Sequence, residues 1–197
     1  MKMFRVILCF FIILTFTSCG KNELMDLSGF IHNYNFISDS DLSLTDFIIQ
    51  KDADIKYTAV LTDSGHNIII SLCQGSDNKI KYCKIAFVKE DSKVPTIEET
   101  AAFCNVIIDA MTAYCNFDIQ TSQTLADNFH LSDTKTLTKN GELTLSKDNF
   151  YFVYYSTDMI SQFTIYNTYI QKIEPTEKPV SKPYFGEDFV VKDKETP

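Results

Sequence analysis

The chain has 197 residues, of which 45% are hydrophobic, 22% charged and 13% aromatic, and this is the size and composition of one globular domain. Its 6 Gly and 5 Pro exclude the collagen-like and low-complexity classes. The 26 acidic residues outnumber the 18 basic ones and give a formal net charge of -8, so we expect no nucleic-acid partner, because phosphates repel an acidic chain.

Residues 1–18 have the layout of a secretory signal peptide. Lys2 and Arg5 form a basic start, residues 6–16 are an unbroken apolar run, and small residues precede Cys19. As a helix this run would reach about 16 Å, roughly half of a ~30 Å hydrocarbon core, so it is too short for a membrane span. Its removal takes away two basic residues and no acidic one, which moves the net charge to -10.

The segment Phe16-Thr17-Ser18-Cys19 resembles the lipobox of bacterial lipoproteins, with Phe16 where Leu is usual. The resemblance covers only the N-terminus and implies that Cys19 becomes the new first residue and carries acyl chains such as palmitate. Each buried CH₂ contributes about 0.8 kcal/mol, so several chains hold a protein stably on a bilayer. The expected location is the extracytoplasmic face of the cell membrane or outer membrane. The alternative is an ordinary signal peptide, with Cys19 incidental.

After the anchor, residues 19–42 show no clear apolar period, and we expect a tether there. Strand signals then follow one another closely. Strands are expected over residues 44–50, 55–62, 67–74 and 79–89, with turns at Asp63-Ser64-Gly65 and at residues 75–78. These segments predict an antiparallel meander.

A helix is predicted over residues 97–115. Thr96 and Glu99 have the spacing of a capping box, in which each side chain satisfies a free backbone N–H. One apolar stripe follows, formed by Ala101, Cys104, Ile108, Met111 and Cys115. A weaker amphipathic segment covers residues 122–130.

The remaining strands are expected over residues 142–146, 150–155 and 163–171. Residues 158–173 also fit a helical spacing, but their β-branched and aromatic residues favour a strand. Four of the five prolines fall in residues 174–197, which predicts a flexible tail. The expected fold is therefore α+β, with one domain over residues 43–173. Its antiparallel sheet has about six or seven strands, and the helix 97–115 covers one face in the order strands, helix, strands.

Four cysteines remain once Cys9 leaves with the signal peptide and Cys19 is lipidated: Cys73, Cys83, Cys104 and Cys115. An exported chain permits disulfides. Cys104 and Cys115 would lie roughly 16 Å apart along one helix, too far to pair. A loop at residues 75–78 puts Cys73 and Cys83 on opposite faces of the hairpin, whereas a loop at 77–79 puts them opposite each other. The open alternatives are a 73–83 bridge, a bridge from Cys83 to the helix, and four buried thiols.

No cofactor or metal is expected. The cysteine spacings match no zinc motif, His32, His66 and His130 are isolated, and phosphate-loop and nucleophile-elbow motifs are absent. The acidic pairs Asp39 with Asp41 and Glu98 with Glu99 are expected to be solvated. A Cys–His nucleophile would have to be assembled by the fold.

The aromatic run 150–155 is the most distinctive feature of the domain. Its simplest interpretation is a central strand that is apolar on both faces. The functional interpretation is a surface of tyrosines that stacks on sugar rings or contacts a protein, and its candidates are Tyr151, Tyr155, Tyr166 and Tyr169.

The leading functional hypothesis is a lipid-anchored, non-catalytic binding or accessory module whose partners are the bilayer and an envelope protein or glycan. The alternatives are a small exported enzyme and a structural subunit of an envelope complex. A cleft that brings His66 or His130 to a cysteine or carboxylate would favour the enzyme, and a surface rich in tyrosine would favour binding.

Overall fold

The computed structural model describes residues 24–63, 65–89 and 94–169. The expected signal peptide, the lipidation site Cys19 and the expected tail over residues 174–197 lie outside these described residues.

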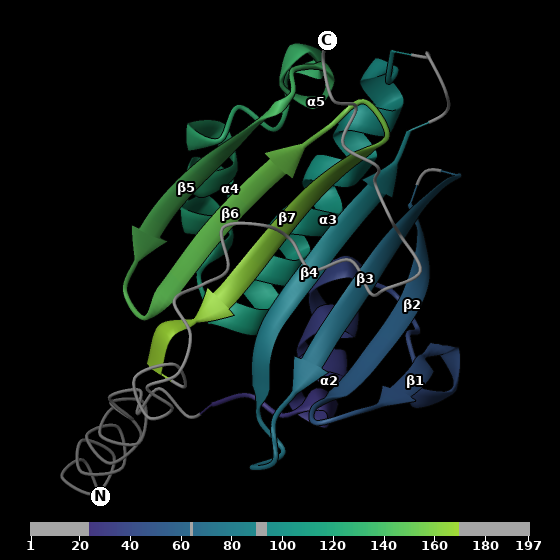
Figure 1. Ribbon diagram of the computed structural model, residues 1–197, viewed down its shortest axis with the longest axis vertical. Coiled ribbons are helices and arrows are strands. Elements are labelled where there is room, and N and C mark those ends of the chain that lie inside the picture. The colour runs from purple at the N-terminus through teal and green to yellow at the C-terminus, as the bar shows by residue number, and fades with distance from the viewer. Residues whose placement is uncertain (1–23, 64, 90–93, 170–197) are drawn as a thin grey trace, which may run out of the picture.

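Seven antiparallel strands form one sheet in the order β1-β2-β3-β4-β7-β6-β5 (Figure 1). The first meander contains β1 (Ile48–Lys51), β2 (Ile55–Asp63), β3 (His66–Gln74) and β4 (Ile80–Val88). The second contains β5 (Gly141–Lys147), β6 (Phe150–Ser156) and β7 (Ile160–Asn167). The two meanders meet where β4 pairs with β7, so the sheet is continuous although its halves are far apart in the sequence.

The helices lie on one face of the sheet, which is the rear face in Figure 1. They are α2 (Leu27–Ser38), α3 (Ile97–Cys115), α4 (Ile119–Asn128) and α5 (Thr134–Thr138), with a short 3-10 turn η1 (Leu44–Asp46) before β1. The expected α+β fold with a helix over residues 97–115 is confirmed. Within the described ranges, none of these helices combines the length and apolar character needed to cross a bilayer.

Helix α3 begins at the expected capping box. The Thr96 N–H donates to Glu99 Oε2 at 2.7 Å, and the Glu99 N–H donates to Thr96 Oγ1 at 3.1 Å. Asn116 ends the helix in the left-handed region, with φ of 55°. Between these caps α3 buries a wide apolar side against the sheet.

The prediction of a tether over residues 19–42 is wrong for its second half, because residues 27–38 form α2. Asp26 caps this helix by accepting a hydrogen bond from the Gly29 N–H at 2.8 Å. Leu27, Phe30 and Tyr34 then fall on one side and join the core. Ile31 and Ile37 also pack against the core, whereas Phe36 is exposed, so the apolar residues of this segment do not all fall on one side. The domain consequently begins before residue 43.

Further differences concern the ends of the strands and one short helix. Residues 44–46 form a 3-10 turn instead of the start of a strand, and α5 is an element that the sequence did not predict. The ambiguous segment 158–173 contains a strand, as favoured, but this strand covers residues 160–167 instead of 163–171, and residues 168–169 are helical. The strand is paired on both sides, and it buries the polar residues Ser161, Gln162 and Thr164 as well as apolar ones.

Phe30 tests whether α2 belongs to the folding unit. Its side chain is 0% exposed, whereas Phe36 on the same helix is 85% exposed. Replacing a buried Phe by Ala removes apolar contacts and leaves a cavity, so Phe30→Ala should lower the free energy of unfolding by about 3–5 kcal/mol. Phe36→Ala should change it by less than about 0.5 kcal/mol. Urea denaturation of the two variants makes the comparison, and equal effects would mean that α2 is a tether.

Candidate functional site

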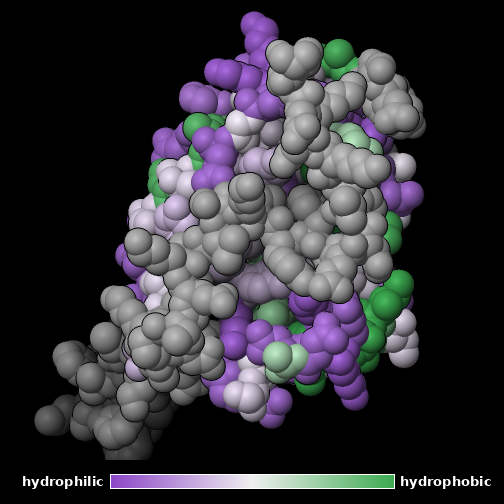
Figure 2. Space-filling view, in the orientation of Figure 1, coloured by the Kyte–Doolittle hydropathy of each residue, from purple (hydrophilic) through white to green (hydrophobic). Residues whose placement is uncertain are grey.

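The second face of the sheet, opposite the helices, carries the candidate tyrosines. In β7, Phe163 is buried on the helix side and its ring lies 5.2 Å from the ring of Phe129, measured between centroids. Because side chains alternate along a strand, Gln162, Thr164 and Tyr166 belong to the opposite face. We call this face the tyrosine face, and Figure 2 views the molecule from its side. Its central members on β4, β7 and β6 are Tyr82, Lys84, Ala86, Gln162, Thr164, Tyr166, Tyr151, Val153 and Tyr155.

Three tyrosines form a row across β4, β7 and β6. The Tyr82 and Tyr166 ring centroids are 5.8 Å apart, and those of Tyr166 and Tyr151 are 6.4 Å apart. In the sheet register, Tyr166 stands directly opposite Tyr82 on one side and directly opposite Tyr151 on the other. The row is therefore a rigid aromatic surface, because it is fixed by backbone pairing as well as by ring contacts.

The structure brings together only part of the predicted tyrosine set. Tyr151 and Tyr166 are neighbours in the row, and Tyr155 lies on the same face opposite Gln162. Tyr169 is half exposed but lies beyond the end of β7. Sequence reasoning missed Tyr82. Its side chain lies on the sheet face opposite to that of the buried Cys83 and Ile85, but the pairing of β4 with β7 that brings it beside Tyr166 gives no local signal.

Gln162 holds an unpaired acceptor on this face. Its side chain is 2% exposed, and its Nε2 donates to Thr164 Oγ1 at 3.1 Å. Among the described residues, its Oε1 has no hydrogen-bond partner. A buried polar atom without a partner costs about 1–3 kcal/mol.

Lys84 provides a positive charge beside the tyrosine row. Its Nζ lies 5.9 Å from the centroid of the Tyr82 ring. Burial and the nearby charge of Lys56 lower the pKa of Lys84 to about 8. Burial, followed by the neighbouring Cys73, raises the pKa of Tyr82. Because this pKa lies above physiological pH, the positive form of Lys84 predominates there, and the Tyr82 hydroxyl keeps its proton.

The four described cysteines are free and buried. Leu72 stands opposite Cys83, and Cys73 stands opposite Tyr82, so Cys73 and Cys83 occupy opposite faces of the hairpin as the loop at 75–78 predicts. The pairing itself is shifted by a bulge between Cys73 and Gln74. The structure thus has the arrangement of four buried thiols.

Burial suppresses the reactivity of these thiols. It raises the pKa of Cys104 to about 11, and together with the Asp54 carboxylate it raises that of Cys73 to about 11. The pKa values of Cys83 and Cys115 are also raised by burial. A nucleophilic cysteine needs the thiolate form, which these environments disfavour.

His66 lines a groove of about 440 Å³ together with Lys89 and Glu99. No hydrogen bond between described residues joins His66 or His130 to a cysteine or carboxylate. In the same part of the chain, no group of three or more His, Cys, Asp or Glu side chains is arranged to hold a metal ion.

Lys89 is buried and serves the fold. Its Nζ donates to the carbonyls of Leu137 and Thr157 and to Ser156 Oγ, the last at 2.9 Å. An ammonium has three donors, and all of them are used here. Lys89 therefore ties α5 to the β6–β7 turn and has no proton donor left for a substrate.

Comparison of the chain with protein-family models, with curated proteins and with solved structures finds no match in any of the three.

The raised thiol pKa values predict how stability depends on pH. Unfolded thiols ionise near pH 9 while the buried ones stay protonated, so the free energy of unfolding should fall as the pH rises from about 9 to about 11. Each thiol contributes up to about 1.4 kcal/mol per pH unit. A Cys83→Ala/Cys115→Ala double variant should show a shallower slope in urea denaturation. Lys84, with its lowered pKa, contributes to the pH dependence of stability in the opposite direction. Both proteins retain Lys84, so its contribution cancels when their slopes are compared.

Alkylation provides the control for this experiment. Under denaturing conditions without reductant, all four of these cysteines should take up label, and peptide mapping identifies them. Bridged cysteines, or equal slopes in the two proteins, would contradict the assignment of four free thiols.

Proposed function

We propose that this chain is a non-catalytic binding or accessory module, held by acyl chains on Cys19 at the extracytoplasmic face of a membrane, and that the tyrosine face contacts an envelope glycan or protein. The single observation that carries the binding role is the continuous row Tyr82, Tyr166 and Tyr151 on the sheet face opposite the helices. Tyrosine suits such a role because it combines a large apolar ring with a polar tip.

A further feature of the tyrosine face supports binding. Lys84 adds a cation on a chain whose formal net charge is -8. An aromatic surface with a cation beside it would recognise a polar partner.

The chemistry of the described side chains supports a non-catalytic role. The buried thiols have raised pKa values, and all three donors of Lys89 are occupied by the fold. The anchor is supported by the lipobox-like segment ending at Cys19. An anchored module needs no active site, since its task is to hold a partner near the membrane.

The anchor is tested by Cys19→Ala. Without the thiol no thioether to lipid forms, so incorporation of labelled palmitate into the chain should disappear and the precursor should accumulate. Gel fluorography after metabolic labelling measures both effects. The Cys73→Ala variant is the control and should keep wild-type incorporation. Labelling of Cys19→Ala at the wild-type level would reject the anchor and leave the binding role to be judged separately.

The tyrosine face is tested by the double variant Tyr151→Ser/Tyr166→Ser. Loss of two rings should weaken binding to immobilised envelope glycan fragments or envelope proteins by about tenfold or more, since aromatic contacts dominate many interfaces. Phe36→Ser, which removes an exposed ring on the helix side, is the matched control and should bind like the wild type. The chain has no Trp, so a change in tyrosine fluorescence reports ligand binding directly. Equal binding by the two variants would reject this face.

A further inference from the structure

Part of the β2 edge has no strand beside it. β2 has nine residues, and β1 pairs only with the first four, Ile55 to Thr58. Residues 59–63 pair with β3 on one side, and among the described elements no strand pairs with them on the other. An unpaired edge presents backbone N–H and C=O groups that an added strand can bind.

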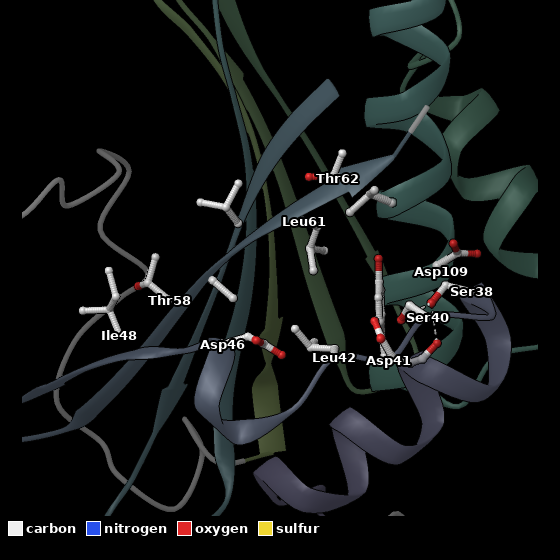
Figure 3. A pocket seen from close by; sticks show the side chains of 14 residues that line it. Ser38, Ser40, Asp41, Leu42, Asp46, Ile48, Thr58, Leu61, Thr62 and Asp109 are labelled. Carbon is white, nitrogen blue, oxygen red and sulfur yellow. Dashed lines mark hydrogen bonds between the residues drawn. The ribbon is translucent and has the colours of Figure 1, made fainter. Parts of the chain in front are cut away.

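A groove of about 540 Å³ lies along this unpaired edge. Its walls come from β2, from the segment after α2 and from α3 (Figure 3). Leu61 points to the helix side, towards Leu42, whereas Thr58 and Ile48 lie on the other side of β2. The groove therefore reaches both faces of the sheet edge, which is the space that an extra strand and its alternating side chains would occupy.

The two sides of the groove differ in chemistry. On the helix side lie three carboxylates, those of Asp41, Asp46 and Asp109, and none of the described lining residues is Lys, Arg or His. On the other side Ile48 and Val60 are 78% and 60% exposed. Hydrophobic residues are visible along the β1–β2 edge of the molecule in Figure 2.

We propose that this groove, which we call the β2 groove, binds an extended peptide segment of another protein by strand addition to residues 59–63. The segment alternates basic and apolar side chains. The basic side chains point to the helix side, towards the negative charge of Asp41, Asp46 and Asp109, and the apolar ones cover Ile48 and Val60. This site is separate from the tyrosine face and does not depend on it.

Charge favours a basic peptide over a second copy of the chain as the occupant of the β2 groove. Two copies joined through their β2 edges would bring Asp41, Asp46 and Asp109 of both molecules to one interface. Like charges that face each other across an interface oppose association. The net charge of -8 adds to this repulsion. A metal ion is a poorer occupant than a basic peptide, because the three carboxylates are not arranged to hold a metal ion within the described chain.

The test uses the full chain, purified in detergent, and a labelled peptide of sequence Thr-Lys-Val-Lys-Val-Lys-Thr. Fluorescence anisotropy should show binding that weakens as salt rises. A peptide with Glu in place of Lys should not bind. Asp41→Lys should weaken binding by at least about tenfold, because an attraction becomes a repulsion. Asp127→Lys, an exposed charge reversal on α4, is the matched control and should bind as the wild type does.

Hydrogen exchange separates strand addition from a loose electrostatic contact. Bound peptide should slow exchange of those amides in residues 59–62 that do not bond to β3. Binding without this protection would overturn strand addition, as would equal binding by Asp41→Lys and Asp127→Lys or no binding at all. Sedimentation without peptide supplies the last criterion. A dimer that is lost in Asp41→Lys would mean that a second copy of the chain occupies the edge. Protection of these amides before peptide is added would mean that another segment already covers them. Either result would overturn the proposal.

Discussion

The pairing of β4 with β7 is the constraint on which the rest of the structure depends. It joins two local meanders into one sheet and sets what each face contains. In this register Ile85 stands opposite Phe163 within the core that the helices cover, and three residues away Tyr82 stands opposite Tyr166 on the other face. A shift of one residue would exchange the two faces, so the core and the tyrosine row are specified together.

All the described helices lie on one face of the sheet. α3, α4 and α5 lie between β4 and β5 in the sequence, and α2 precedes β1, so the helices contribute one layer while the strands contribute the other. Lys89 secures this layer where α5 meets the β6–β7 turn. The two proposed sites lie on the other sheet face and at the β2 edge.

The elements with strong local signals could be predicted from the sequence. The capping box at Thr96 places the start of α3, and β2, β3 and β6 lie within a residue or so of their expected bounds. α2 was missed because its apolar residues include the exposed Phe36 as well as those that face the core, and α5 because a helix of five residues has little periodicity. Of the candidate site, alternation along β6 and β7 could place Tyr151, Tyr155 and Tyr166, but nothing local connects them to Tyr82.

By itself the sequence determined the class of the fold, the main helix and the succession of strands along the chain, since capping, turn residues and alternation act over a few positions. Only the tertiary structure decided that Cys73 and Cys83 lie on opposite faces and which strands become neighbours across the middle of the sheet. It therefore decided that Tyr82 joins Tyr166, that Gln162 Oε1 is buried with no partner among the described residues, and that three separate aspartates line one groove. Long-range pairing depends on the whole packed core, and no short stretch of sequence encodes it.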